Sequence, residues 1–317
     1  MSTPLTGVTV DAHHHLWNPP AEGEYPWMTG RFAPLRREYS AEHLGPELAK
    51  HGVRATVVVQ ARADLRETRD LLALTTRHQF LAGVVGWVDL TSPDVGGQIR
   101  ALRAGPSGHR LVGIRHDASA EPDPRWLLRA DVGRGLDAVA EAGLAFDLEV
   151  TPRELTAAAR AAAAHPDLRF VLDHLGKPPI AGQPIAGQPA AAGETASWHD
   201  GFAQLASVPN VWCKLSGLVT EADWQRWTDA DLAPYIADAV LRFGPSRLLF
   251  GSDWPVCELA ATYTQVLSAV QHCLPALDRT QATQIFGLNA VEVYRLDLRL
   301  SGPAATGPGL PESSSSA

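Results

Sequence analysis

Short apolar runs alternate with longer segments that carry apolar residues at helical spacing along most of the chain. The short runs are continuously apolar rather than alternating with polar residues, which is typical of strands buried on both faces of a parallel sheet. The pattern therefore predicts eight buried strands, at residues 8–10, 55–59, 84–88, 111–114, 145–150, 169–172, 211–214 and 247–250.

Helical periodicity fills most of the intervals between these strands. Repeated strand–helix units within one chain fit a (β/α)8 barrel, and a doubly wound open sheet is the rival fold of the same α/β class. The helices are predicted at residues 42–51, 66–79, 95–103, 127–142, 152–165, 197–206 and 231–243.

Polar side chains placed directly after six of the strands favour the barrel. In a barrel the carboxyl ends of all strands converge on one mouth, whereas in an open sheet the strands at opposite edges hold such residues far apart. We therefore predict a single-domain (β/α)8 TIM barrel, with a mouth that collects His13, His15, Gln60, Arg115, His116, His174, Lys214 and Asp253.

The first strand runs into Asp11-Ala12-His13-His14-His15. Because side chains alternate between the two faces of a strand, we expect Asp11, His13 and His15 to share one face. Neutral imidazole is the commonest protein ligand for metals, so this edge is predicted to bind a metal or to handle protons. A purification-tag remnant would be terminal and detached from a strand, which leaves a surface histidine cluster as the alternative.

Two internal segments and the C-terminus depart from the repeat. Residues 17–39 hold four prolines among aromatics and predict a structured loop, in which Trp27 either lines a pocket or packs over the mouth. A tandem repeat of Ile-Ala-Gly-Gln-Pro predicts an expanded loop at 177–197, as a surface insertion in preference to a lid. The barrel domain is expected to span 1–297, followed by a disordered tail at 298–317.

Composition limits the classes of function. With 317 residues, 45% of them hydrophobic, and a net charge of -8, the chain can bury a large core, and its charge argues against nucleic acid or an anionic membrane as a partner. No stretch has the length and apolarity of a membrane span or an export segment. Three cysteines are too few and too widely spaced for a disulfide framework or a zinc site, so we expect reduced thiols in a cytoplasm.

Three side chains at the predicted mouth can carry chemistry. Asp253, partly shielded and facing imidazoles, can accept a proton from water, and capping of the next turn is the alternative. His174 faces the mouth if Asp173 points into the barrel wall, whereas the reverse orientation leaves a structural histidine. Arg115 offers a planar set of donors to a carboxylate or an oxyanion, with a rim salt bridge as the alternative.

An ordered series of short motifs over residues 8–296 resembles the amidohydrolase superfamily, in the branch of sugar-lactone hydrolases that holds L-fuconolactonase and L-rhamnonolactonase-like enzymes. Each motif alone is weak, and the ordered set is specific for the family rather than for a substrate. The motifs are Asp11-Ala12-His13-His14-His15-Leu16-Trp17, Tyr25-Pro26-Trp27, Val59-Gln60-Ala61, Gly86-Trp87-Val88-Asp89, Gly113-Ile114-Arg115-His116, Leu172-Asp173-His174-Leu175-Gly176-Lys177-Pro178, Cys213-Lys214-Leu215-Ser216-Gly217 and Gly251-Ser252-Asp253-Trp254-Pro255-Val256-Cys257.

The resemblance implies roles for four residues. His13 and His15 match the first-strand His-x-His pair of the family, His174 its sixth-strand histidine and Asp253 its eighth-strand aspartate. Members with two metals carry a bridging Lys or Glu after the fourth strand and a His after the fifth. This sequence has neither, which argues against a binuclear centre.

The resemblance thus leaves room for a single divalent ion, Zn²⁺ or a similar metal. His13, His15 and Asp253 would hold it, and Glu149 is a weaker fourth candidate. The branch includes metal-assisted and metal-independent hydrolases, so catalysis without a metal stays open.

The activity that the resemblance implies is hydrolysis of a small-molecule sugar lactone, such as L-fucono-1,5-lactone or an L-rhamnonolactone, to the aldonic acid. Asp253 would take a proton from water, His13 and His15 would hold the oxyanion with or without a metal, and His174 would orient the reactants. Sugar hydroxyls or an acidic group would be bound by Arg115, His116, Lys214, Gln60 and Trp27.

Two other functions stay open at this point. One is decarboxylation, or hydrolysis of an aromatic-acid (pyrone-type) lactone, on the same barrel. The other is a barrel that binds sugar without turnover, against which the presence of Asp253, His13 and His15 argues. The sequence leaves the oligomeric state open, with a homodimer as one option.

Overall fold

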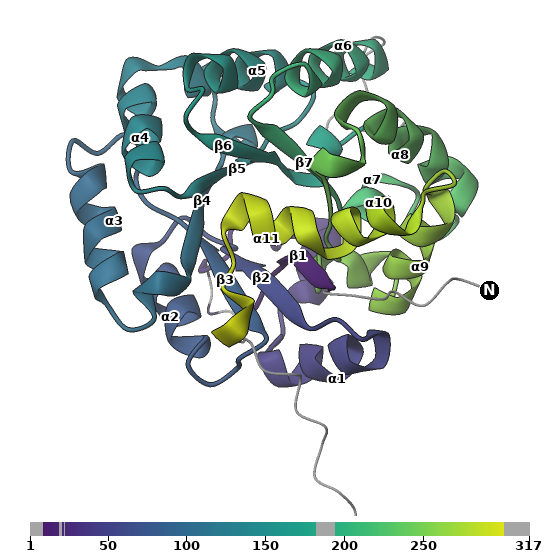
Figure 1. Ribbon diagram of the computed structural model, residues 1–317, viewed down its shortest axis with the longest axis horizontal. Helices are drawn as coiled ribbons and strands as arrows, with labels where there is room; N and C mark the ends of the chain where they lie inside the picture. Colours follow the sequence, from purple (N-terminus) through teal and green to yellow (C-terminus); the bar gives the residue numbers. More distant parts are fainter. Residues whose placement is uncertain (1–8, 19–20, 22, 182–193, 301–317) are drawn as a thin grey trace, which may run out of the picture.

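Eight parallel strands follow one another in chain order around a single sheet, and Figure 1 shows them as a ring with helices outside it. The computed structural model describes residues 9–18, 21, 23–181 and 194–300. The predicted (β/α)8 barrel is confirmed. Its strands are β1 Val10–His14, β2 Ala55–Val59, β3 Leu81–Gly86, β4 Leu111–Asp117, β5 Ala145–Glu149, β6 Arg169–Leu172, β7 Val211–Leu215 and β8 Leu248–Phe250.

Backbone hydrogen bonds between the two ends of the chain close the barrel. Asp253 N donates to His13 O at 2.8 Å, and His15 N donates to Trp254 O at 2.7 Å. This pairing lies beyond the end of β8, which stops at Phe250. The closure therefore holds Asp253 beside the two histidines, although they lie at opposite ends of the sequence.

Helices pack around the outside of the strands, and α11 crosses one end of the barrel (Figure 1). The helices are α1 Ala41–His51, α2 Leu65–Leu74, α3 Val95–Ala104, α4 Ala130–Glu141, α5 Leu155–Ala164, α6 Glu194–Ala206, α7 Leu218–Glu221, α8 Asp229–Phe243, α9 Tyr263–Cys273, α10 Arg279–Thr283 and α11 Asn289–Tyr294.

Apolar side chains form two packed layers. In the barrel interior, Ala55 and Ala145, the first residues of β2 and β5, pack in one cluster with Val293 and Tyr294 of α11. A second and larger cluster fills the space between the strands and the surrounding helices. α11 therefore covers the barrel end at which the strands begin, opposite their carboxyl ends.

The expectation that Asp11 shares a face with His13 and His15 is wrong. The register between β1 and β2 shifts between Asp11 and His14, and such an irregularity breaks the strict alternation of side chains. Asp11 accepts a hydrogen bond at 3.1 Å from the hydroxyl of Tyr263 on α9, on the helix side of the strand. Asp11 therefore ties α9 to the barrel seam instead of joining the imidazoles.

Four helices in the described part of the chain were not predicted from the sequence, α7, α9, α10 and α11, and two of them complete the fold. α9 supplies the eighth repeat, and Thr262 and Gln265 form a capping box at its start, a signal that is present in the sequence. α11 is short and follows a π-helical turn at Gln284–Leu288, which interrupts regular helical spacing.

Two sequence expectations fall partly outside the described residues. The expanded loop expected at 177–197 lies mostly in residues 182–193, which are not described, and α6 begins at Glu194, earlier than expected. Leu298–Leu300 form one turn of 3-10 helix instead of the start of a disordered tail, and residues 301–317 are not described. Within the described part of the chain, no helix combines the length and apolarity needed to cross a bilayer.

Candidate active site

Four side chains, called the His–Asp cluster below, meet at the carboxyl ends of β1, β6 and β8. They are His13, His15, His174 and Asp253. The Nε2 atoms of His13, His15 and His174 lie 3.7, 3.6 and 4.0 Å from Asp253 Oδ1, and those of His13 and His15 lie 3.2 Å apart. All four residues are buried, and His15, His174 and Asp253 form part of a pocket wall. The structure thus brings together every residue predicted to be catalytic.

Left-handed backbone conformations set the side-chain directions of two residues of the His–Asp cluster. Asp253 has a φ of 57° and His174 a φ of 52°, values that residues other than glycine rarely adopt. Because of the turn at His174, both Asp173 and His174 point into the barrel, Asp173 toward Lys214 and His174 toward Asp253. The sequence analysis treated an inward-facing His174 and an inward-facing Asp173 as alternatives, but in the structure both side chains face inward.

Hydrogen bonds at the Nδ1 atoms orient two of the imidazole rings. His15 Nδ1 lies 2.8 Å from Val59 O, which can only accept, so Nδ1 carries a proton, and we assign a lone pair to Nε2 in the neutral ring. His174 Nδ1 lies 2.9 Å from Ser216 Oγ. Burial lowers the pKa of His174, although Asp253 acts in the opposite direction, so this ring is neutral at pH 7.

A fully buried lysine lies beneath His13. Lys214 Nζ is 2.6 Å from Asp147 Oδ2, 2.8 Å from Asp173 Oδ1 and 3.1 Å from His13 Nδ1. Burial disfavours the ammonium form, but the two carboxylates outweigh it and raise the pKa of Lys214 above its usual value. The substrate contact predicted for Lys214 is corrected accordingly, because its side chain has no exposed surface and lies in the barrel interior.

Arg115 and Glu149 form an ion pair in the pocket wall. Arg115 Nη1 lies 3.0 Å from Glu149 Oε2 and 3.2 Å from Asp173 Oδ2, while Nη2 donates to Gln60 O. Lys177 Nζ lies 3.2 Å from Glu149 Oε1. Although burial alone would raise it, these two cations bring the pKa of Glu149 down to about 2. Because Glu149 is occupied by two cations, the geometry gives no support to its candidate role as a metal ligand.

A pocket of about 970 Å³ lies above the His–Asp cluster. Trp27, Gln60 and His116, all predicted to bind substrate, line it. Trp27 Nε1 donates to Ala61 O at 2.9 Å, and His116 stacks on Trp126 with 4.1 Å between the ring centroids. These contacts hold two aromatic side chains rigidly at the pocket wall.

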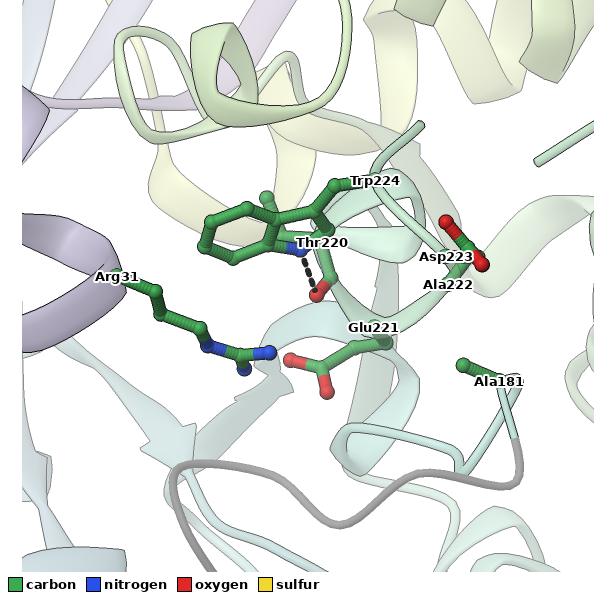
Figure 2. A pocket seen from close by; sticks show the side chains of 7 residues that line it. All are labelled: Arg31, Ala181, Thr220, Glu221, Ala222, Asp223 and Trp224. Carbon is green, nitrogen blue, oxygen red and sulfur yellow. Dashed lines mark hydrogen bonds between the residues drawn. The ribbon is translucent and has the colours of Figure 1, made fainter. Parts of the chain in front are cut away.

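Glu221 and Arg31, which the sequence analysis did not single out, join this pocket to a smaller cavity of about 230 Å³. Both residues line both cavities. Figure 2 shows the Arg31 guanidinium directed toward the Glu221 carboxylate and beside Trp224, whose ring centroid lies 4.5 Å from Arg31 Cζ. Glu221 ends α7, a helix of four residues that is too short to produce a periodic pattern.

Charges that line the large pocket are mostly compensated within the protein. Among the residues that the structure describes, seven with carboxyl side chains and five Arg or Lys line it. Such a wall offers many hydrogen-bonding groups to a neutral polar ligand. The cations are accounted for by the pairs Arg62–Glu24, Arg66–Asp64, Arg115–Glu149 and Lys177–Glu149, and by Arg31, which faces Glu221.

The donor atoms of the His–Asp cluster fit one divalent ion. Zn²⁺ binds His nitrogen and Asp oxygen tetrahedrally at about 2.0–2.2 Å, which places neighbouring ligand atoms about 3.4 Å apart. Four of the six separations between these donor atoms, at 3.2–4.0 Å, are close to this value. His13, His174 and Asp253 are close enough together to share an ion, and His15 Nε2 lies beside this group, 3.2 Å from His13 Nε2 and 3.6 Å from Asp253 Oδ1. His174 thus joins the ligand set expected from the sequence.

Comparisons with known proteins point to one family. The profile of the amidohydrolase family matches residues 10–296. Two L-fucono-1,5-lactonases, from Burkholderia ambifaria and Burkholderia multivorans, are 38% and 37% identical to this chain over 91% and 92% of its length and 96% and 97% of theirs. A crystal structure of a Burkholderia multivorans amidohydrolase with bound zinc is 34% identical, covers 92% of this chain and 100% of its own, and has a TM-score of 0.82.

Proposed function

The chain belongs to the amidohydrolase family, and from this premise we propose that it hydrolyses the ring ester of a neutral sugar lactone to the aldonic acid. The observation that carries the proposal is the position of Asp253, whose carboxylate faces three imidazole Nε2 atoms within 4.0 Å at the pocket wall. The two lactonase relatives, which match nearly the whole chain, support L-fucono-1,5-lactone or a similar aldonolactone as the substrate.

Asp253 acts as the general base in the proposed reaction. Its carboxylate accepts a proton from a water molecule as the water oxygen forms a bond to the lactone carbonyl carbon. The bond between this carbon and the ring oxygen then breaks, and Asp253 returns the proton to the departing oxygen. The product is the open-chain aldonic acid, and no further reactant is needed.

The remaining members of the His–Asp cluster stabilise and orient the reacting groups. A divalent ion such as Zn²⁺, held by His13, His15, His174 and Asp253, would supply Lewis-acid stabilisation of charge on the carbonyl oxygen. The zinc in the related Burkholderia multivorans structure supports this assignment. Ser216, at 2.9 Å from His174 Nδ1, orients this ring so that its Nε2 points toward Asp253 and is available to the ion.

The charges of the pocket favour a neutral sugar lactone as the substrate rather than an aromatic dicarboxylate. Recognition of two carboxylates requires cations that are free to pair with them, whereas the cations here already face protein carboxylates. Trp27, Gln60 and His116 would contact the sugar, because they line the pocket. Arg115 also lines the pocket, and an N–H group of its guanidinium would donate to a sugar hydroxyl.

The direct test is hydrolysis of a panel of aldono-1,4- and aldono-1,5-lactones by the zinc-loaded protein, followed as acid release at constant pH. We expect hydrolysis of at least one deoxy-sugar 1,5-lactone, such as L-fucono-1,5-lactone. A chelator should abolish this activity, and added Zn²⁺ should restore it. Tight binding of these lactones without acid release would instead favour a sugar-binding barrel, and carbon dioxide release from an aromatic acid would favour a decarboxylase.

Glu221 should make substrate binding depend on pH near neutrality. Burial raises the pKa of Glu221 to about 7, against the opposing effects of Lys177 and Arg31. Below that pH the carboxyl group is neutral, and above it the carboxylate is a charged acceptor for a sugar hydroxyl, a hydrogen bond worth about 1.5–3 kcal/mol. KM for the lactone should therefore fall by roughly five- to tenfold between pH 6 and pH 8, where tenfold is the limit set by the change in the ionised fraction of Glu221.

Glu221→Gln isolates this effect, because the amide stays neutral at every pH. We expect the variant to keep the higher KM at pH 8 and to lose the pH dependence between pH 6 and pH 8. The matched control is Asp223→Asn, since Asp223 lines the smaller cavity and is not part of the large pocket. A KM profile of Glu221→Gln that follows the wild type would exclude contact between Glu221 and substrate.

Other expectations about the cellular setting remain proposals. Cys213, Cys257 and Cys273 are all free and buried, which supports reduced thiols and a cytoplasmic location. A homodimer and the exclusion of nucleic acid as a partner remain predictions from the sequence.

A further inference from the structure

His116 bonds within the protein through both of its ring nitrogens. Trp87 Nε1 can only donate and lies 3.3 Å from His116 Nδ1, so Nδ1 is the acceptor in this contact. His116 Nε2 lies 2.8 Å from Glu121 Oε1, and because a carboxylate oxygen can only accept, Nε2–H is the donor. Trp126 covers one face of the ring, at an interplanar angle of 8°. His116 therefore offers a ligand its open ring face and no free polar atom.

Trp87, the donor to His116, is itself fixed through its backbone. Thr68 of α2 is fully buried, and its Oγ1 donates to Trp87 O at 3.2 Å and accepts from Trp87 N at 2.8 Å. Trp87 follows β3, and His116 belongs to the neighbouring strand β4. These contacts fix the plane of the His116 ring and therefore the direction in which Nε2–H points.

The backbone of Glu121 is held separately from its side chain. Arg153, in the loop between β5 and α5, donates from Nη2 to Glu121 O at 2.8 Å and to Ser119 O at 3.3 Å. Glu121 has an extended backbone, with φ -77° and ψ 139°, which is the conformation favoured before a proline, and Pro122 follows it. The backbone and one carboxylate oxygen of Glu121 are thus in place before any ligand binds.

The second carboxylate oxygen of Glu121 is available to the large pocket. Glu121 lines this pocket, and its side chain is 26% exposed. Within the described part of the chain, its ion-pair partner is His116, and no Arg or Lys lies within ion-pair distance of it. Three other carboxylates of the pocket wall do pair with Arg or Lys, namely Glu24, Asp64 and Glu149. Glu121 therefore presents an oriented acceptor that no protein cation occupies.

We propose that Glu121 accepts a hydrogen bond from a hydroxyl group of the sugar lactone through Oε2, and that His116 is the positioning residue that holds Oε1. The acceptor is preorganised, so little side-chain freedom is lost when the sugar binds. Glu121 then determines specificity, because a sugar without a hydroxyl at the matching ring position leaves this acceptor without a partner. The inference rests on the proposed function for its class of substrate.

Glu121→Ala removes this contact and leaves the backbone bond from Arg153 in place. We expect KM for L-fucono-1,5-lactone to rise by about 10–100-fold with kcat unchanged, which is the loss expected for a hydrogen bond to a charged acceptor. Glu121→Gln should recover part of this loss, because its amide can still bond a hydroxyl group. Steady-state acid release measures both constants, and circular dichroism checks the fold.

Asp123→Asn is the matched control, because it removes a carboxylate from the same loop. Asp123 is exposed, accepts a hydrogen bond from Arg125 N at 2.8 Å and does not line the large pocket. Its KM should equal that of the wild type. An unchanged KM in Glu121→Ala, or an equal rise in Asp123→Asn, would overturn the proposal.

A series of 1,5-lactones, each with one ring hydroxyl removed or inverted, tests whether the contact is direct. For the lactone that lacks the bound hydroxyl, KM of the wild type should be raised, and Glu121→Ala should raise it no further. A rise by the same factor for every lactone in the series would mean that Glu121 acts on the shape of the pocket and binds no hydroxyl, which would refute the proposal.

The part assigned to His116 is tested with a double variant. His116→Phe keeps an aromatic ring against Trp126 but has no Nε2–H for Glu121, so we expect part of the rise in KM seen in Glu121→Ala. His116→Gln should restore much of the affinity, because its amide can donate to Glu121. In the Glu121→Ala background, His116→Phe should have no further effect on KM. Multiplied losses in the double variant would show that His116 acts independently of Glu121.

Binding of L-fucono-1,5-lactam, the ring amide of the same sugar, separates this inference from the proposed function. Its Kd is measured by calorimetry with the zinc-loaded wild type and Glu121→Ala. Hydrolysis of lactones with equal KM in both proteins refutes the role of Glu121 alone. If the wild type hydrolyses no lactone, the proposed function fails, and the lactam decides about Glu121. A Kd at least tenfold weaker in Glu121→Ala then supports the contact, and equal or absent binding overturns it.

Discussion

Asp253→Asn is expected to lower kcat for lactone hydrolysis by about 10²–10⁴-fold. An amide oxygen cannot take the proton from water that the carboxylate accepts in the proposed reaction. The fold should persist, because the contact of residue 253 across the barrel seam is made by its backbone N–H to His13 O and not by its side chain. Steady-state acid release from L-fucono-1,5-lactone, with circular dichroism as the check on folding, measures both effects.

Glu258→Gln provides a control for the loss of a neighbouring carboxylate. Glu258 accepts a hydrogen bond at 2.9 Å from Trp254 Nε1, just after the seam, and it is not part of the pocket wall. This variant should retain the wild-type kcat. Full activity in Asp253→Asn, or an equal loss in both variants, would mean that Asp253 is not the base.

Lys214→Met is expected to reduce the free energy of unfolding by about 3–5 kcal/mol. Lys214 lies between Asp147 and Asp173 with no exposed surface, so its removal leaves two carboxylates buried without their shared cation. Arg115 and Tyr294 still contact these carboxylates, and this limits the loss. Equilibrium unfolding in urea at pH 7 measures the change.

The double variant Lys214→Met/Asp147→Asn separates charge from packing. It removes one of the uncompensated carboxylates, and the amide introduced at position 147 can still contact the Tyr294 hydroxyl that Asp147 bonds in the wild type. We expect it to recover part of the stability lost in Lys214→Met. A double variant that is less stable than Lys214→Met would contradict a charge-compensated barrel interior. The same conclusion would follow if the free energy of unfolding of Lys214→Met were within about 1 kcal/mol of the wild-type value, since surface substitutions alone cause changes approaching that size.

The barrel could be predicted because its strands and helices differ strongly in pattern. Continuous apolar runs such as Ala55–Val59 indicate a sheet covered on both faces, and polar residues directly after them indicate a shared mouth. The convergence of His13, His15, His174 and Asp253 followed from that reasoning and from the family resemblance, and the structure places all four together.

The orientation of individual side chains could not be predicted in the same way. A register shift in β1 places Asp11 on a different face from the histidines. The left-handed backbone conformation at His174 directs the side chains of both Asp173 and His174 into the barrel. Both features depend on contacts between strands that are distant in sequence, whereas strict alternation is a local rule. A local pattern therefore locates the site but does not determine which side chains face the pocket.

Lys214 shows a second limit of the sequence. A lysine after an apolar strand can reach into the pocket or remain in the barrel interior, and the choice depends on partners from other strands. Here Asp147 of β5 and Asp173 after β6 hold the ammonium in the interior. Glu221 and Arg31 were missed for a similar reason, because only the folded chain brings these two residues together at the pocket.

The measurement that tests the central claim most directly is a comparison of kcat/KM for L-fucono-1,5-lactone and for 2-pyrone-4,6-dicarboxylate with the zinc-loaded wild-type protein. The His–Asp cluster and its charge-compensated pocket predict efficient hydrolysis of the neutral sugar lactone and little or no hydrolysis of the dicarboxylate. Preferential hydrolysis of the dicarboxylate would contradict the account. So would a failure to hydrolyse both of these compounds and every other aldonolactone.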